Sequence, residues 1–245
     1  MRLRPMADAY ILQEEDPSIR ELPFEDRFGL LVDVLYNRRL TNGVKRILKE
    51  ANLDQPEACI ADIDYRSGRV LDRRMIMYLA GCEYIADSLN VFITGAAGCG
   101  KTYLACALAM EAVKQKISAY YVLLPDLLLE FEQAREEKRY SELLSFYVKK
   151  KLLIIDEWLG HIPTSDEQQI IKALLSARRN KASTIFCSQY LKEGWYQQLG
   201  GKKSTEAEAI LDRIIHDAYE INITYKDPDN AKSMREVYSK RKSIY

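Results

Sequence analysis

A glycine-rich loop of fixed spacing constrains this chain more than any other feature. It fits the phosphate-loop pattern G-x-x-x-x-G-K-[ST] at every fixed position, and its residues are Gly95, Ala96, Ala97, Gly98, Cys99, Gly100, Lys101 and Thr102. Glycine permits backbone angles and close approach that a Cβ would block, so consecutive N–H groups can point at phosphate oxygens. Lys101 adds a point charge for the β and γ phosphates, and the Thr102 hydroxyl can bind Mg²⁺. The loop therefore predicts a site for a nucleoside triphosphate and magnesium.

The segments on either side of the loop are those that this mechanism requires. Residues Asn90–Thr94 read as a short buried strand, and Thr102–Lys114 reads as an Ala- and Leu-rich helix. The amino terminus of that helix would add its partial positive charge at the phosphates. A chance glycine-rich turn would explain the glycines, but not the strand, the Lys-Thr pair and the helix together.

From residue 90 onwards the sequence alternates strands and helices, which is typical of a parallel sheet covered on both faces. The expected strands are Val91–Thr94, Ser118–Leu123, Leu152–Ile155, Thr184–Cys187 and Tyr219–Thr224, and the helices between them include Pro125–Arg139, Ser141–Val148 and Asp166–Arg179. Residues 1–89 read as helical, with helices expected over 22–40, 44–51 and 72–84. We therefore predict an α/β phosphate-loop fold with a helical N-terminal domain (1–89) and an ATPase domain (90–245).

Composition limits the classes of protein that remain. A hydrophobic content of 47% over 245 residues is enough for a real core. No apolar run approaches the ~20 residues that span a bilayer, and the first residues lack an apolar signal core. The five cysteines are scattered without a C-x-x-C pair, so we expect reduced, buried thiols, no membrane association and a cytoplasmic location. Because the net charge is zero, contact with a polyanion must come from local patches.

An acidic pair follows the strand that begins at Leu152. In a phosphate-loop ATPase a carboxylate must arrive beside Mg²⁺, and we expect it on the strand next to the phosphate loop. Asp156 would hold the metal through water, and Glu157 would polarise the attacking water as general base. Such a pair alone is commonplace in solvated turns. With the phosphate loop upstream, it favours a hydrolysing ATPase of the additional-strand class over a nucleotide kinase.

Two further polar positions are interpreted from their place at the end of an element. An apolar strand ends in the polar pair Ser188 and Gln189. We expect Gln189, or as second choice Ser188, to orient water or sense the γ phosphate. Capping of the strand is the plainer alternative. Arg213 falls at the edge of the apolar helical face in Ala209–His216. It could pair with an adjacent aspartate, or reach a neighbouring subunit's ATP as a transition-state cation. Sequence spacing leaves both roles open.

Together these segments resemble the IstB-like ATPases of insertion sequences and their relatives, the DnaC-type helicase loaders, in the initiator clade of AAA+ proteins. The strongest parts are Gly95–Thr102, Leu152–Glu157, Ser183–Gln189, Ala209–His216 and Ser233–Arg235. The resemblance implies that Arg213 is the finger completing a neighbour's site and that Arg235 is a second nucleotide sensor. We also expect Tyr103, which follows Thr102, among the nucleotide-binding residues. The insertion Lys226–Asn230 is a departure from the family pattern, because it lengthens the approach to Arg235. Too few residues follow Arg213 for a full helical lid, so a reduced or absent lid is expected.

The resemblance also implies a function. Proteins of this kind form homo-oligomers with ATP sites between subunits, engage target DNA and stimulate a partner transposase. The alternative is a DnaC-like loader that grips a replicative helicase through its N-terminal extension. A third hypothesis, a nucleotide-dependent scaffold that hydrolyses little, is disfavoured because a scaffold needs neither the base Glu157 nor the finger Arg213.

Support for DNA contact comes from clustered basic residues, because phosphate binding needs Lys and Arg side chains. The clusters are Arg38, Arg39, Lys45, Arg46 and Lys49; Lys149, Lys150 and Lys151; and Lys172, Arg178, Arg179 and Lys181. A run of charge is often only a solvated helix face. No zinc finger or helix-turn-helix spacing is visible, so sequence-specific readout of DNA is not expected.

Overall fold

A six-stranded sheet forms the centre of the molecule in a computed structural model, which describes residues 3–66, 68–201, 204–216, 218–227 and 233–239. The strand order is β1-β6-β2-β5-β4-β3. The strands are β1 (Arg69–Val70), β2 (Asn90–Gly95), β3 (Ala119–Leu123), β4 (Leu152–Asp156), β5 (Ser183–Ser188) and β6 (Ala218–Tyr225). All neighbouring pairs are parallel except β1 and β6. The carboxyl ends of β2, β4 and β5 therefore meet at one edge of the sheet.

All five expected strands are confirmed, and the sheet corrects one expectation about their order. The acid-bearing strand β4 is not the neighbour of β2, because β5 lies between them. Strand β1 was not predicted, since its two residues are too few to show an alternating pattern. It pairs antiparallel with the end of β6 through Arg69 opposite Tyr225 and Val70 opposite Thr224.

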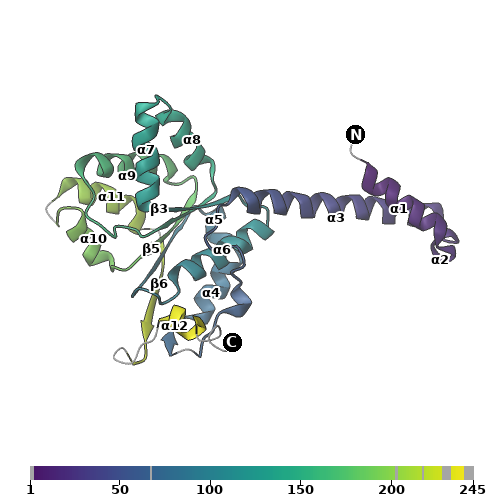
Figure 1. The fold of residues 1–245 in the computed structure, drawn as a ribbon, viewed down its shortest axis with the longest axis horizontal. Coiled ribbons are helices and arrows are strands. Elements are labelled where there is room, and N and C mark those ends of the chain that lie inside the picture. Colours follow the sequence, from purple (N-terminus) through teal and green to yellow (C-terminus); the bar gives the residue numbers. More distant parts are fainter. Residues whose placement is uncertain (1–2, 67, 202–203, 217, 228–232, 240–245) are drawn as a thin grey trace.

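Alternation of apolar side chains along the strands builds a core on each face of the sheet, because successive residues of a strand point to opposite faces. Val91 and Ile93 pack on one face, and Phe92 between them packs on the other. The first face is covered by α6 (Lys101–Lys114), α4 (Arg73–Ala80), α5 (Glu83–Ala86) and the end of α3 (Phe24–Glu50). The second is covered by α7 (Leu124–Glu136), α8 (Tyr140–Lys149), α9 (Ser165–Arg178), α10 (Lys192–Gln198) and α11 (Thr205–Ile215). The result is a three-layered α/β body (Figure 1).

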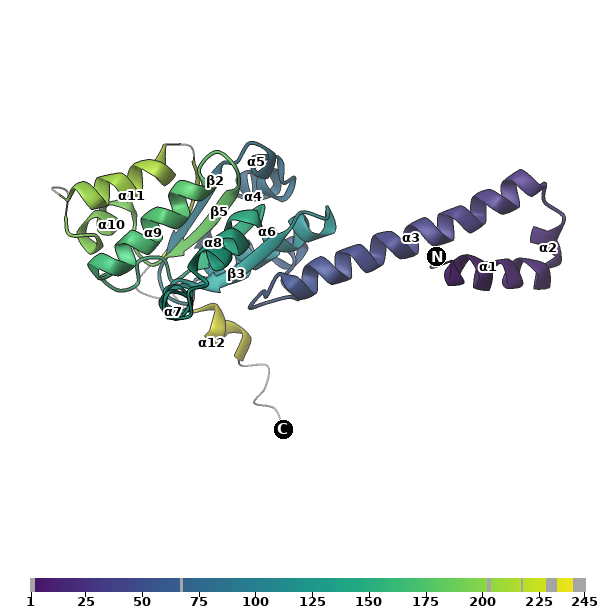
Figure 2. The same ribbon diagram turned by 90° about the horizontal axis from the view of Figure 1, so that it is seen from above.

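A helical arm projects from this body. Helix α1 (Arg4–Glu15) and the short α2 (Pro17–Arg20) fold back along α3, whose far end joins the sheet (Figure 2). The helices expected over 22–40 and 44–51 are one continuous helix, because Gly43 inside it costs only about 1 kcal/mol. The helix expected over 72–84 is instead broken between α4 and α5, where Cys82 has a left-handed backbone with φ of 66°.

The segment between the arm and β2 shares its core with the sheet. Ala51, Ile60, Ile76 and Tyr84 are buried in the same cluster as the side chains of β2 and α6. The second half of the range 1–89 thus packs with the range 90–245. The division of the chain at residue 89 stays a prediction.

A buried arginine at the end of α9 links that helix to α8, to the loop after α8 and to β5 on the second face. Arg178 is 2% exposed, and it ends α9. Its guanidinium donates to the carbonyl oxygens of Tyr147 (2.6 Å), Lys150 (2.8 Å) and Ser183 (2.6 Å) and to Thr184 Oγ1 (3.1 Å). Burial lowers its pKa to about 9, which leaves the group charged at neutral pH. The expectation that Arg178 contacts DNA is therefore wrong, because its donors are used inside the fold.

Replacing Arg178 by methionine is expected to lower the free energy of unfolding by about 2 kcal/mol or more, because buried carbonyl oxygens would lose their partners. Urea unfolding followed by circular dichroism measures this change. Arg179→Met is the matched control, because Arg179 is exposed and its replacement should change stability by less than about 0.5 kcal/mol. Equal effects of the two replacements would contradict the structural role of Arg178.

Candidate ATP site

The glycine-rich loop connects β2 to α6 at the carboxyl edge of the sheet. Gly95 and Gly100 have φ angles of 147° and 100°, which favour glycine. A Cβ on Gly95 would lie 2.6 Å from the Ile223 carbonyl oxygen, and one on Gly100 would lie 2.7 Å from Arg69 Nη1. The loop therefore depends on glycine for its backbone angles and for its close neighbours. The first N–H groups of α6 have no partner within the helix and are available to an anion.

Lys101 lies across the loop. Its Nζ donates to the carbonyl oxygens of Gly95 (2.8 Å) and Ala96 (3.0 Å), and the residue is only 9% exposed. The ammonium group is thus held at the loop, where a charge for the β and γ phosphates is needed.

Thr102 on α6 and Asp156 at the end of β4 lie in direct contact, although β5 separates β4 from β2, the strand before the loop. Thr102 Oγ1 donates to Asp156 Oδ2 (2.6 Å), and the Tyr121 hydroxyl donates to the same oxygen (3.0 Å). The backbone N–H of Glu157 donates to Asp156 Oδ1 (2.8 Å). A hydroxyl and a carboxylate side by side are the oxygen ligands that Mg²⁺ prefers. These residues therefore fit a magnesium ion bound together with the phosphates.

Tyr121 is a residue of this site that sequence reasoning missed. It lies on β3, and burial, followed by the adjacent Asp156, raises the pKa of its phenol. The hydroxyl therefore stays protonated and acts as a hydrogen-bond donor that orients the carboxylate. Nothing in the spacing of the motif marks Tyr121, because only the pairing of β3 with β4 brings it close to Asp156.

Glu157 differs from Asp156 in its surroundings. It follows the end of β4 with φ of 55°, and its side chain is exposed while Asp156 is 5% exposed. The next residue is anchored, because the Trp158 N–H donates to the Cys187 carbonyl oxygen on β5 (2.8 Å). The turn thus separates the two carboxylates, with Asp156 held inward and Glu157 in contact with solvent.

The polar pair after β5 has divided roles. Ser188 is 1% exposed; its hydroxyl donates to the Trp158 carbonyl oxygen (2.8 Å) and accepts from the Tyr190 N–H (3.1 Å) and Trp195 Nε1 (3.0 Å). Ser188 therefore caps the strand and ties neighbouring loops together. Gln189 is exposed directly after β5, the strand that separates β2 from β4.

Arg213 lies away from the loop of its own chain. Its Nε donates to Ser176 Oγ on α9 (2.8 Å), and its Nη1 donates to the Ala209 carbonyl oxygen. Asn90 Nδ2 donates to the carbonyl oxygen of the next residue, Ile214 (3.5 Å), which places this end of α11 at the amino end of β2. The loop is at the carboxyl end of the same strand. Asp212 pairs with His216 (3.0 Å), not with Arg213.

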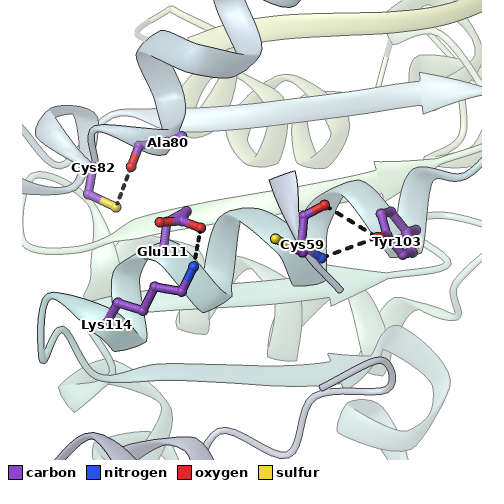
Figure 3. A network of polar contacts seen from close by, with 6 residues as sticks. All are labelled: Cys59, Ala80, Cys82, Tyr103, Glu111 and Lys114. Atoms are coloured by element: carbon purple, nitrogen blue, oxygen red, sulfur yellow. Dashed lines mark hydrogen bonds and ion pairs between the residues drawn. The ribbon is translucent and has the colours of Figure 1, made fainter. Parts of the chain in front are cut away.

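Tyr103 connects the loop helix to the segment before β1. Its hydroxyl accepts from the Cys59 N–H (3.2 Å) and donates to the Cys59 carbonyl oxygen (3.3 Å), as Figure 3 shows. On the same helix Lys114 pairs with Glu111 (2.7 Å). The phenol of Tyr103 is thus engaged with the protein backbone.

The end of the chain also reaches the loop. The N–H of Met234, the first residue of α12 (Met234–Ser239), donates to the Gly98 carbonyl oxygen (2.9 Å). Arg235 belongs to this helix, but its side chain lies outside the described residues. The second sensor role of Arg235 therefore stays a prediction.

The cysteines are free thiols, and all but the half-buried Cys59 are buried. Burial raises the pKa of Cys82 and of Cys106 to about 11, so both stay protonated at neutral pH. Cys99, inside the loop, is fully buried, and burial also raises the pKa of its thiol. Reduced, buried thiols were expected, and these four confirm that expectation.

Comparison with known proteins supplies the family. The family of IstB-like ATP binding proteins matches residues 1–240. An insertion-sequence ATP-binding protein of Sinorhizobium fredii is 33% identical over 91% of this chain and 90% of its own length. The ATP-binding protein of insertion sequence IS1162 from Pseudomonas fluorescens is 35% identical over 77% of this chain and 82% of its own length. That of insertion sequence IS21 from Pseudomonas aeruginosa is 30% identical over 85% and 78%.

Solved structures show the same fold at low sequence identity. The structure of DnaI covers 75% of this chain and 99% of its own, with a TM-score of 0.57 and 22% identity. The DnaC helicase loader covers 69% and 97%, with a TM-score of 0.54 and 19% identity. The fold is thus that of AAA+ phosphate-loop domains of the DnaC and DnaI type.

The site and the fold define an ATP-binding protein of the AAA+ class. Within that class, the chain belongs to the family of IstB-like ATP binding proteins. Both the expected fold and the resemblance found in the sequence are confirmed. Within the described residues, no helix combines the length and apolar character needed to cross a bilayer.

Lys101→Ala is expected to abolish ATP binding, because it removes the only cation of the phosphate-loop motif and the two bonds that hold the loop. Titration with a fluorescent ATP analogue measures the affinity. Lys114→Ala, at the far end of the same helix, is the control and should bind as the unchanged protein does. Retained tight binding by the Lys101 variant would contradict the assignment of this site.

Proposed function

We propose that this protein is an ATPase that assembles on duplex DNA as an oligomer and stimulates a partner transposase. The observation that carries the proposal is the contact of Thr102 with Asp156 beside the loop, with Glu157 exposed next to it. This arrangement supports hydrolysis as well as binding of ATP. Family membership and the insertion-sequence names of the relatives support the role in transposition.

The residues at the carboxyl edge divide the chemistry between them. The loop N–H groups and Lys101 bind the β and γ phosphates. Thr102 and Asp156 would hold Mg²⁺, which when bound neutralises charge on those phosphates. Glu157 accepts a proton from the attacking water, and its exposed position beside the buried Asp156 suits that role. Gln189, at the end of the intervening strand, orients that water or senses the γ phosphate.

Arg213 completes the site of a neighbouring subunit. Its location at the amino edge of the sheet supports this role, because the loop of the same chain is at the opposite end of β2. The bond to Ser176 Oγ holds the guanidinium against α9. An ATP site shared between subunits makes hydrolysis depend on oligomerisation, and the arginine stabilises charge that develops in the transition state.

Exposed basic side chains gather at the same amino edge and support contact with DNA. Lys149 and Lys151 flank Lys150, whose carbonyl oxygen accepts a hydrogen bond from Arg178. Arg179 and Lys181 lie on the loop between α9 and β5. All four of these side chains are exposed, whereas the ammonium of Lys150 lies over the ring of Phe146 (4.6 Å). Arg178 thus holds the two basic segments next to each other.

The remaining basic candidates are distributed on two helices. On α3, Lys45, Arg46 and Lys49 are exposed, while the side chains of Arg38 and Arg39 lie outside the described residues. Lys172 on α9 is half-buried. We propose that the exposed members contact DNA phosphates, which makes binding weaken steeply with salt.

Glu157→Gln is expected to bind ATP, to lose hydrolysis by about 100-fold or more, and to stay assembled on duplex DNA, because the amide cannot accept the proton. Phosphate release and analytical ultracentrifugation, at low and high salt, measure both effects. Glu132→Gln, on the exposed face of α7, is the control. Normal turnover would remove Glu157 as the base. If duplex DNA does not change the assembly state, the result would favour a loader that acts on a replicative helicase.

Arg213→Ala is expected to bind ATP normally and to hydrolyse it poorly. Mixing it with Lys101→Ala subunits should restore part of the activity, because some interfaces then combine an intact loop with an intact arginine. Mixing Lys101→Ala with a chain that carries both changes should restore nothing, since neither partner has an intact loop. No recovery at any ratio in the first mixture would contradict the action of Arg213 across subunits.

A further inference from the structure

Two groups from outside the phosphate loop hold its outward-facing carbonyl oxygens. Arg69 Nη1 donates to the Cys99 carbonyl oxygen (2.8 Å), and the Met234 N–H donates to that of Gly98 (2.9 Å). Inside the loop, Lys101 Nζ already binds two earlier carbonyls. The loop is therefore braced from outside as well as from within, at two adjacent peptides.

Arg69 is placed for this contact at the cost of burying a charge. The residue is 8% exposed on β1, and its Nη2 donates to the Asp64 carbonyl oxygen (2.9 Å). Burying a guanidinium is unfavourable unless its donors are satisfied. The planar fork of arginine meets that condition by binding two carbonyls in different directions at once. A short two-residue strand does not need such a side chain for its pairing with β6.

The bond to Cys99 fixes the direction of the following amide. In a trans peptide the C=O and the next N–H point in opposite directions. Because the Cys99 carbonyl points at Arg69, the Gly100 N–H points away from it, on the side left for a phosphate oxygen. No side chain fits at Gly100 while Arg69 holds this position, since a Cβ there would lie 2.7 Å from Arg69 Nη1.

Both braces are attached to the same strand. Arg69 pairs opposite Tyr225 at the end of β6, and α12 with Met234 follows β6 in the chain. Strand β6 in turn pairs with the whole length of β2, from Asn90 opposite Ala218 to Gly95 opposite Ile223. The loop is thus positioned by β2, from which it continues, and by Arg69 and Met234, which are both connected to the end of β6.

We propose that Arg69 is a positioning residue for ATP, which orients the Cys99–Gly100 peptide so that its amide is ready for the phosphates. This inference rests on the proposed binding of the ATP phosphates by this loop. It makes nucleotide affinity depend on the segment before β2, which packs with α6 and leads back to the helical arm. The phosphate loop alone is then insufficient for full affinity for ATP.

Titration with a fluorescent ATP analogue, and its displacement by ATP and by inorganic tripolyphosphate, tests the role of Arg69. Arg69→Met is expected to weaken ATP and tripolyphosphate alike by about tenfold, because the loss acts through phosphate-binding amides. Arg69→Lys keeps the charge but not the fork, so it should weaken both by about threefold. Arg74→Met, an exposed arginine nearby, should change neither. Thermal melting without nucleotide checks that each variant is folded.

The outcomes separate this inference from the assignment of the site. Unchanged ATP affinity in folded Arg69→Met would overturn the proposal, and so would weaker ATP binding with unchanged tripolyphosphate binding. If Arg69→Met does not fold, Arg69→Lys decides by the same two criteria. Lys101→Ala is titrated alongside: if it binds ATP as tightly as the unchanged protein, the site itself is wrongly assigned. If it loses binding while the Arg69 variants do not, only the role of Arg69 fails.

Discussion

The hydrogen bond from Thr102 to Asp156 is the contact on which the ATP site depends. It joins the helix that follows β2 to the end of β4, across the intervening β5. Parallel pairing is what makes this contact reachable, because it brings the carboxyl ends of all three strands to one edge. The Tyr121 hydroxyl and the Glu157 N–H then hold the carboxylate in place. A hydroxyl and a carboxylate that fit a magnesium ion are thereby brought together from residues far apart in the chain.

The opposite edge of the sheet carries a different set of charged side chains. Arg213 and the exposed basic residues near Lys151 and Arg179 lie there, remote from the loop of their own chain. In the function that we propose, a subunit with its loop at one edge and its arginine at the other forms a complete ATP site only in an assembly. The proposal of an oligomer therefore rests on the direction of the strands as well as on Arg213 itself.

Two buried arginines show how little a basic residue in a sequence says about its environment. Arg178 belongs to a run of charge that suggested a DNA-binding stripe, yet its guanidinium is used by four acceptors inside the fold. Arg69 belongs to no motif, yet it touches the phosphate loop. In both cases burial is compensated by carbonyl oxygens whose positions depend on strand pairing and helix ends, and these are absent from local spacing.

By itself the sequence determined the phosphate loop, the acid-bearing strand, the five parallel strands and the family, because each depends on local spacing or on periodicity. Glycine angles, strand alternation and the Lys-Thr pair all act within a few residues. Only the tertiary structure decided that β5 separates β2 from β4, that Tyr121 orients Asp156 and that Arg69 braces Cys99. Those features are contacts between segments that are distant in the chain. They are stabilised by burial of apolar side chains in the two cores, one on each face of the sheet.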